Sequence, residues 1–211
     1  MKTASVCLLL GSACLFAVAA NASAADLTVS VGDASGKPVA AAVVTFTPAA
    51  GAQISAANRA GPFTMAQKNI QFAPYVLAVP VGATVDFPNQ DRVNHHVYSF
   101  SPVQPFQFPL YGQGKKRSLR FDHIGTVALA CNIHDSMSAY IRIVDTPYYA
   151  TTDQSGRVTL KDLPQGAGTL TVWQPMLDAP DHAVSRQAQA GGTQSFSLKL
   201  KAAALVSSGA Y

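Results

Sequence analysis

The sequence predicts an all-β protein, and three observations support this prediction. Only 12% of the residues are charged. Val, Leu, Phe, Thr, Gly and Pro are frequent, a composition typical of strands joined by turns. Short apolar runs also alternate with polar residues between clear turn signals. No convincing helical pattern is present, so we expect no helix.

The first 24 residues have the features of an export signal. Lys2 supplies a positive start, residues 4–20 are apolar, and Ala22–Ala24 matches the small-residue pattern of signal peptidase cleavage. A retained membrane anchor would need about 20 apolar residues, but polar residues begin at Asn21. We therefore expect cleavage after Ala24, a periplasmic or secreted protein, and no membrane span in the remainder.

Export changes the interpretation of the cysteines. Cys7 and Cys14 leave with the signal, so the mature chain retains only Cys131. A single thiol cannot form an internal disulfide. In an exported protein such a cysteine is reactive, is paired with another molecule or is held by a metal.

The strand pattern divides the mature chain into three blocks. In 25–62, Leu27, Val29 and Val31 alternate, a turn follows, a second strand covers 43–47, and 48–62 is expected to be a linker. Block 63–145 contains several short strands and a proline-rich stretch at 102–114 that we expect to be a loop. Block 146–201 begins with a turn and resumes alternation, and 202–211 is expected to be a frayed tail. Short strands at close spacing favour a sandwich or barrel.

The most informative segment runs from Cys131 through His134 to Met137. A thiol, an imidazole and a thioether lie within seven residues, directly after a predicted strand. A loop this short can turn all three donors toward one point. Two His, one Cys and a weak axial Met form the type 1 copper site. The pair His95-His96, at the start of another strand, supplies the second imidazole.

Each of these residues alone has a simpler explanation. A lone Cys is more often a small buried apolar residue, and Met is more often core filler. Their joint occurrence, at a spacing that a metal can use, favours a site. A cysteine-nucleophile enzyme is the next interpretation, with Cys131 activated by a histidine. It does not account for Met137.

The block from Ile70 to Val144 resembles a cupredoxin of the plastocyanin and amicyanin type. Residues 82–91 are similar to the strand and turn before the first copper histidine, and the C-x2-H-x2-M spacing is that of amicyanin. The resemblance implies a Greek-key sandwich, one type 1 copper ion and the ligands His95, Cys131, His134 and Met137. It also implies an electron carrier and not an enzyme.

One position departs from the family pattern. The family usually has Asn after the first copper histidine, where its side chain ties the ligand loops together, and this chain has His96. Alternation along a strand places His95 and His96 on opposite faces, so both are not expected to bind one ion. The alignment with the family favours His95. The change puts the hydrogen bonding around the site in question.

The flanking blocks have a resemblance of their own. Residues 36–44 and 152–166 look like the two halves of a carboxypeptidase regulatory-like (transthyretin-like) β-domain. The copper domain would then be inserted in, or flanked by, a small second sandwich. The whole arrangement is similar to bacterial proteins labelled methylamine utilization proteins, which implies a redox-partner role.

The donor set and the resemblance to cupredoxins predict one-electron transfer, and the resemblance implies a redox partner that docks weakly near His134. Copper storage or delivery is a second hypothesis, and a copper-stabilised structural module is a third. The net charge of +4 is too small to indicate binding to nucleic acid. The sequence leaves the partner, the reduction potential and the oligomeric state open.

Overall fold

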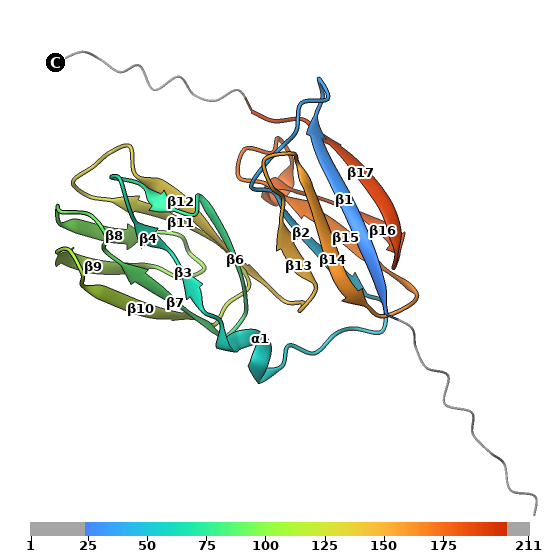
Figure 1. Ribbon diagram of the computed structural model, residues 1–211, viewed down its shortest axis with the longest axis horizontal. Coiled ribbons are helices and arrows are strands. Elements are labelled where there is room, and N and C mark those ends of the chain that lie inside the picture. The colour runs from blue at the N-terminus through green and yellow to red at the C-terminus, as the bar shows by residue number, and fades with distance from the viewer. Residues whose placement is uncertain (1–23, 202–211) are drawn as a thin grey trace, which may run out of the picture.

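The computed structural model of the chain describes residues 24–201, which form two β-sandwiches (Figure 1). The all-β prediction is confirmed, because strands account for almost all of the regular structure in the described residues. The predicted export signal, apart from Ala24, and the predicted tail at 202–211 lie outside the described residues.

The first sandwich combines a five-stranded, a three-stranded and a short two-stranded sheet. The five-stranded sheet has the order β6 (Val76–Pro80), β12 (Ser138–Val144), β11 (Gly125–Cys131), β8 (His95–Ser99) and β9 (Phe106–Tyr111). The three-stranded sheet has the order β10 (Lys116–Phe121), β7 (Ala83–Pro88) and β3 (Phe63–Thr64). The small sheet pairs β4 (Ala66–Gln67) with β5 (Phe72–Ala73).

Alternating side chains build the core of this sandwich. Along β11, Val127, Leu129 and Cys131 point inward, while the residues between them are more exposed. Strands turn every second side chain to the same face, so this period of two buries one side of each strand. Phe87 of β7 and Phe121 of β10 close the core from the opposite sheet. Cys131 is therefore the last inward side chain of β11.

The second sandwich contains strands from both ends of the described chain. One sheet has the order β14 (Arg157–Leu163), β1 (Ala25–Asp33) and β17 (Gly192–Leu198). The other has the order β13 (Tyr149–Thr151), β2 (Val43–Pro48), β15 (Ala167–Trp173) and β16 (Ala183–Gln189). Leu27, Phe46 and Leu170 lie in one shared core. The residues before and after the first sandwich thus pack together.

The two sandwiches meet through a small apolar cluster. Val76 of β6 and Val144 of β12 pack with Val43 of β2 and Trp173 of β15. The Trp173 ring also lies edge-on to Tyr140, with 6.1 Å between ring centroids. Part of the outer face of the five-stranded sheet is consequently covered by the second sandwich. Figure 1 shows β6 and β13 at this junction.

Two short helices contradict the prediction that no helix is present. Helix α1 (Ala56–Ala60) lies inside the expected linker, and a 3-10 turn, η1, spans Pro180–His182. A reciprocal capping box starts α1: Ser55 Oγ accepts from the Asn58 N–H, and Asn58 Oδ1 accepts from the Ser55 N–H. A helix of one turn is too short to show a periodic pattern. Neither helix is long and apolar enough to cross a bilayer, and no other helix lies within residues 24–201.

The expectation of a loop over 102–114 is also wrong in part, because Phe106–Tyr111 forms β9. Pro109 lies in this strand. Proline has no N–H to donate, but an edge strand pairs on one side only and tolerates it. Strand β9 is the edge of its sheet and pairs with β8.

Two turns of identical design allow a matched stability test. The Asp33 carboxylate accepts three hydrogen bonds in one turn, and Asp153 accepts the equivalent three in another. Gly36 and Gly156 follow with φ of 83° and 70°. A Cβ on Gly36 would meet nothing within 4 Å, whereas one on Gly156 would lie 2.3 Å from the backbone oxygen of Val31.

We expect Gly36→Ala to lower the free energy of unfolding by about 1 kcal/mol, the cost of a left-handed conformation with a side chain. Gly156→Ala adds a collision with backbone that cannot rotate away, so we expect a loss of roughly 3 kcal/mol. Urea denaturation of both variants measures the difference. Equal losses in the two variants would contradict the packing shown at Gly156.

Candidate metal centre

Two strand ends and one loop position the candidate ligands. Cys131 is the last residue of β11, and His95 is the first residue of β8. Strands β8 and β11 are antiparallel neighbours, with Val97 opposite Cys131. His134 and Met137 lie in the loop that leads into β12. The sheet therefore brings together residues that are 36 positions apart in the chain.

The ligand atoms converge on one point. The Cys131 Sγ lies 3.7 Å from the Nδ1 of His95 and 3.6 Å from the Nδ1 of His134. These three atoms all lie within 4.8 Å of one another. Met137 is fully buried in the same core cluster as Cys131. One thiol and two imidazoles thus lie together at the end of the first sandwich, and Met137 is buried in the same core as the thiol.

Burial differs among the four side chains. His95, Cys131 and Met137 are buried, whereas His134 is only half-buried. Next to it, Ile133 is 47% exposed. His134 therefore lies between the buried donors and solvent, with an apolar neighbour at the surface.

Backbone hydrogen bonds shape the loop. The Met137 N–H donates to the carbonyl of His134 at 2.9 Å, which turns the chain back toward the core. The Asn132 N–H donates to the carbonyl of His96 at 3.1 Å. This bond links the Cys131 loop to β8 through backbone, so the connection does not depend on the side chain of His96.

The remaining histidines lie away from the cluster. His96 is half-exposed on the opposite face of β8, where its ring contacts Tyr98 at 6.2 Å between centroids. His123 is exposed. His182 belongs to the second sandwich, where its Nδ1 lies 3.0 Å from the carbonyl of Leu177.

Asp91 contacts the candidate metal centre, and the sequence pattern did not single it out. Its Oδ2 lies 2.9 Å from the Nε2 of His95. With Nε2 as the donor, the Nδ1 that faces Cys131 carries a free lone pair. Burial opposes ionisation of Asp91, but hydrogen bonds from the Ile70 N–H, from His95 and from the Asn69 N–H outweigh it and lower its pKa. The carboxylate stays charged and holds the His95 ring in place.

A buried polar network supports Asp91. Asn89 is 1% exposed, and its Oδ1 accepts from the Asp91 N–H while its Nδ2 donates to the carbonyls of Val93 and Tyr111. The Tyr111 hydroxyl donates to Gln67 Oε1 at 2.6 Å. Burial raises the pKa of Tyr111 well above its usual value, so the hydroxyl stays a donor. In the sequence, Asn89 and Asp91 form a polar pair of the kind found in turns, and Asp91 precedes His95 by four residues. This pair was the sequence feature that could have indicated a partner for His95.

The sequence matches no family model and no curated protein. Solved structures similar to parts of the chain include a purple cupredoxin from Nitrosopumilus maritimus, which is 21% identical. That likeness covers 39% of this chain and 99% of the cupredoxin, at a TM-score of 0.36. A mutant of amicyanin in its Cu(I) form is 21% identical, with 48% of this chain and 98% of amicyanin covered, at a TM-score of 0.38.

A copper-containing nitrite reductase, NirK, from Thermus scotoductus SA-01 is 26% identical. This likeness covers 56% of this chain and 28% of the reductase, at a TM-score of 0.39. Each of these likenesses covers only part of this chain. No match supports the methylamine utilization label or the transthyretin-like resemblance of the flanks.

Proposed function

We propose that this protein is an exported electron carrier that holds one copper ion through His95, Cys131, His134 and Met137. The observation that carries the proposal is the spacing of the donor atoms. Metal bonds of about 2.0–2.3 Å to N and S, at trigonal to tetrahedral angles, separate two donors by about 3.5–3.8 Å. The Sγ–Nδ1 separations of 3.7 and 3.6 Å match that range.

The donor set favours copper over other metals. Thiolate and thioether sulfur are soft donors that suit copper(I), while imidazole suits both copper states. When bound, the ion would supply a one-electron couple between these two states. Because the chain already holds three of its four donors in a buried core, little of the site has to move when the electron arrives or leaves.

Each ligand has its own part in the proposal. Cys131 binds as the thiolate, which is the metal-ligating form of cysteine. Asp91 orients the His95 ring through its contact with Nε2, the ring nitrogen that faces away from Cys131. Met137 provides the weak axial donor. With four protein donors, no position remains open for a substrate, which argues against an enzyme.

His134 is the proposed route for the electron to a partner. Its half-exposed ring and the exposed Ile133 lie at the surface beside the buried donors. Transient redox complexes bury little surface, so a patch of this size suits weak, fast docking of a redox protein. The export signal predicted for residues 1–24 would place this exchange in the periplasm or outside the cell.

The flanking strands are part of the same proposal. We assign 63–145 to the copper domain, and 25–62 together with 146–201 to a transthyretin-like domain. The shared core of Leu27, Phe46 and Leu170 supports this division. The second domain covers one side of the five-stranded sheet and leaves the His134 end free.

Copper titration of the mature protein followed by voltammetry tests the function. An electron carrier should bind one copper(II) per chain, absorb strongly in the visible range and show one reversible one-electron wave. Tight copper(I) binding without a reversible wave would instead support storage or delivery. A higher melting temperature with copper, without either signal, would support a structural module.

A further inference from the structure

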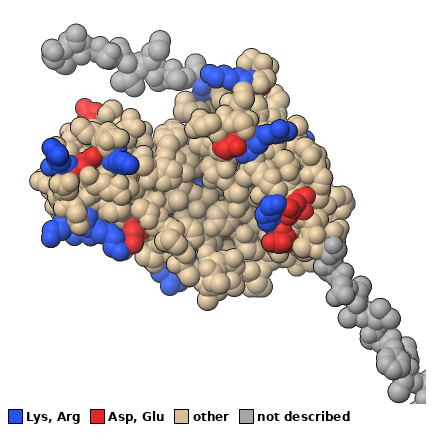
Figure 2. Space-filling view, in the orientation of Figure 1, with Lys and Arg blue, Asp and Glu red and all other residues tan. Residues whose placement is uncertain are grey.

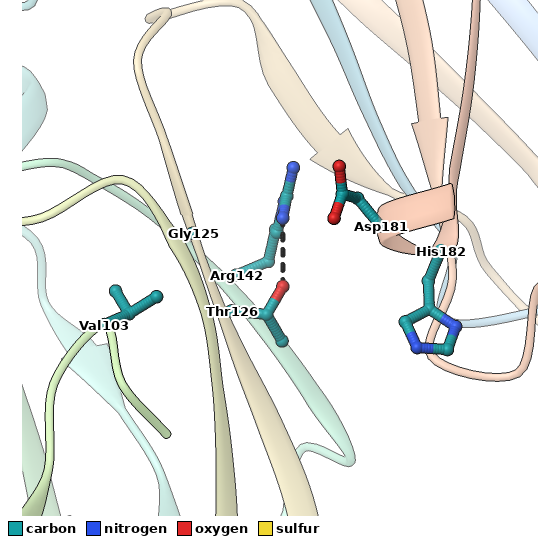
Figure 3. Close-up of a pocket in the computed structure, with 6 residues that line it drawn as sticks. All are labelled: Val103, Gly125, Thr126, Arg142, Asp181 and His182. Carbon is teal, nitrogen blue, oxygen red and sulfur yellow. Dashed lines mark hydrogen bonds between the residues drawn. The ribbon is translucent and has the colours of Figure 1, made fainter. Parts of the chain in front are cut away.

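A cleft of about 390 Å³ lies between the two sandwiches, away from the candidate metal centre. Four of its lining residues belong to the first sandwich and two to the turn η1 of the second. Figure 3 shows them: Val103, Gly125, Thr126, Arg142, Asp181 and His182. None of these residues has a part in the proposed electron transfer.

The Arg142 guanidinium places a positive charge in this cleft and has few hydrogen-bonding partners. One guanidinium nitrogen donates to Thr126 Oγ1 at 2.9 Å, and the group lies 5.5 Å from the centre of the Trp173 ring. Burial lowers the pKa of Arg142, and the negative charges of Asp145 and Asp181 oppose this. Within residues 24–201, however, neither carboxylate forms an ion pair with Arg142. A partly buried guanidinium with free donors favours a carboxylate ligand.

The opposite wall carries a negative charge on a strained turn. Asp181 and His182 have φ of 51° and 54°, in the left-handed region. Two adjacent side chains in this region cost free energy, and such strain concentrates at functional sites. Figure 3 shows the Asp181 carboxylate directed toward the Arg142 guanidinium across the cleft. The turn therefore holds an acceptor opposite a donor.

The third feature of the cleft is apolar. Gly125 has a φ of 145°, and a Cβ there would lie 2.7 Å from a methyl carbon of Val103. The absence of a side chain at Gly125 lets Val103 pack against the strand beside Thr126. A ligand whose charged groups lie between Arg142 and Asp181 would thus have an aliphatic surface next to it.

We propose that this cleft binds a free α-amino acid with a small aliphatic side chain. Its carboxylate would pair with the Arg142 guanidinium, its ammonium group with the Asp181 carboxylate, and its side chain would lie on Val103. Two opposite charges that face each other without forming an ion pair complement a zwitterion better than a simple anion or cation. The site is independent of copper.

Calorimetric titration of the mature protein with L-valine tests the proposal, in copper-free and copper-loaded samples. Isovalerate lacks the ammonium group and isobutylamine lacks the carboxylate, so each removes one of the two charge contacts. We expect saturable binding of L-valine and at least about tenfold weaker binding of both analogues, since a hydrogen bond to a charged group contributes that much.

Arg142→Gln and Asp181→Asn should each weaken valine binding by at least about tenfold. Arg120→Gln is the matched control, because Arg120 is exposed, pairs with Asp122 and does not line the cleft. Circular dichroism checks that each variant is folded. The proposal is overturned if folded wild-type protein shows no saturable heat with L-valine, if either analogue binds as tightly as L-valine, or if Arg120→Gln has the same effect as Arg142→Gln.

Discussion

The Cys131→Ser variant is expected to lose the intense visible absorption of the copper(II)-loaded protein. That absorption requires a thiolate bound to copper, and a serine hydroxyl neither ionises at neutral pH nor offers a soft donor. The Cys131 Sγ is the atom that both His95 and His134 face, at 3.7 and 3.6 Å. We also expect copper affinity to fall by several orders of magnitude. Titration followed by absorption spectroscopy measures both effects.

Ser136→Ala is the matched control for this variant. Ser136 lies in the same loop but is exposed, and it contributes no donor to the cluster. It should keep the full absorption and bind one copper ion. Because serine and cysteine have similar volumes, the melting temperature of copper-free Cys131→Ser should stay near that of the wild type. A wild-type protein without strong absorption, or an unchanged spectrum in Cys131→Ser, would overturn the type 1 copper proposal.

Asp91→Ala is expected to lower copper affinity by about 10- to 100-fold, the range for loss of a group that orients a metal-binding histidine. Without the carboxylate, nothing selects the tautomer of His95 that leaves Nδ1 free toward Cys131. Asp91 also accepts the N–H groups of Asn69 and Ile70, so the loop beside the site is released. Competition with a copper chelator of known affinity measures the loss.

Two further variants separate orientation of His95 from general loop stability. Asp91→Asn retains an oxygen that accepts from His95 Nε2, so it should recover most of the lost affinity. Asp86→Ala removes an exposed carboxylate that bonds Lys116 and Ser118, and it should leave copper binding unchanged. Equal affinities for Asp91→Ala and the wild type would show that Asp91 does not position the ligand.

The face of the molecule drawn in Figure 2 carries few charged side chains. Figure 2 shows that most of this face is uncharged, with basic side chains gathered at the lower left edge of the first sandwich. Strand β10 lies in that region in Figure 1 and carries the exposed Lys116, Arg117 and Arg120. We propose that a redox partner docks weakly near His134 and the exposed Ile133.

The sequence alone was sufficient for the features that depend on local pattern. The alternation of Leu27, Val29 and Val31 predicted β1, because a strand shows its buried face with a period of two. The spacing of Cys131, His134 and Met137 predicted a donor cluster, since a short loop keeps its own residues close together. Alternation also predicted that His95 and His96 lie on opposite faces, and in the structure His95 is buried while His96 is half-exposed.

Other features depend on contacts between distant residues or on single turns. The sequence pattern did not predict β9, because a proline such as Pro109 usually indicates a loop. In the structure β9 pairs with β8 at the edge of the sheet, where proline is tolerated. Helix α1 has too few residues to show the periodic apolar pattern of a helix. Its start is instead fixed by the capping box at Ser55.

Only the tertiary structure placed Asp91 behind His95 and Arg142 opposite Asp181. The first contact depends on the side-chain direction within one loop, and the second depends on how two sandwiches meet around Trp173. Sequence patterns carry the period of a strand and the spacing within a loop, whereas packing between elements determines which distant charges and hydrogen-bonding groups face each other.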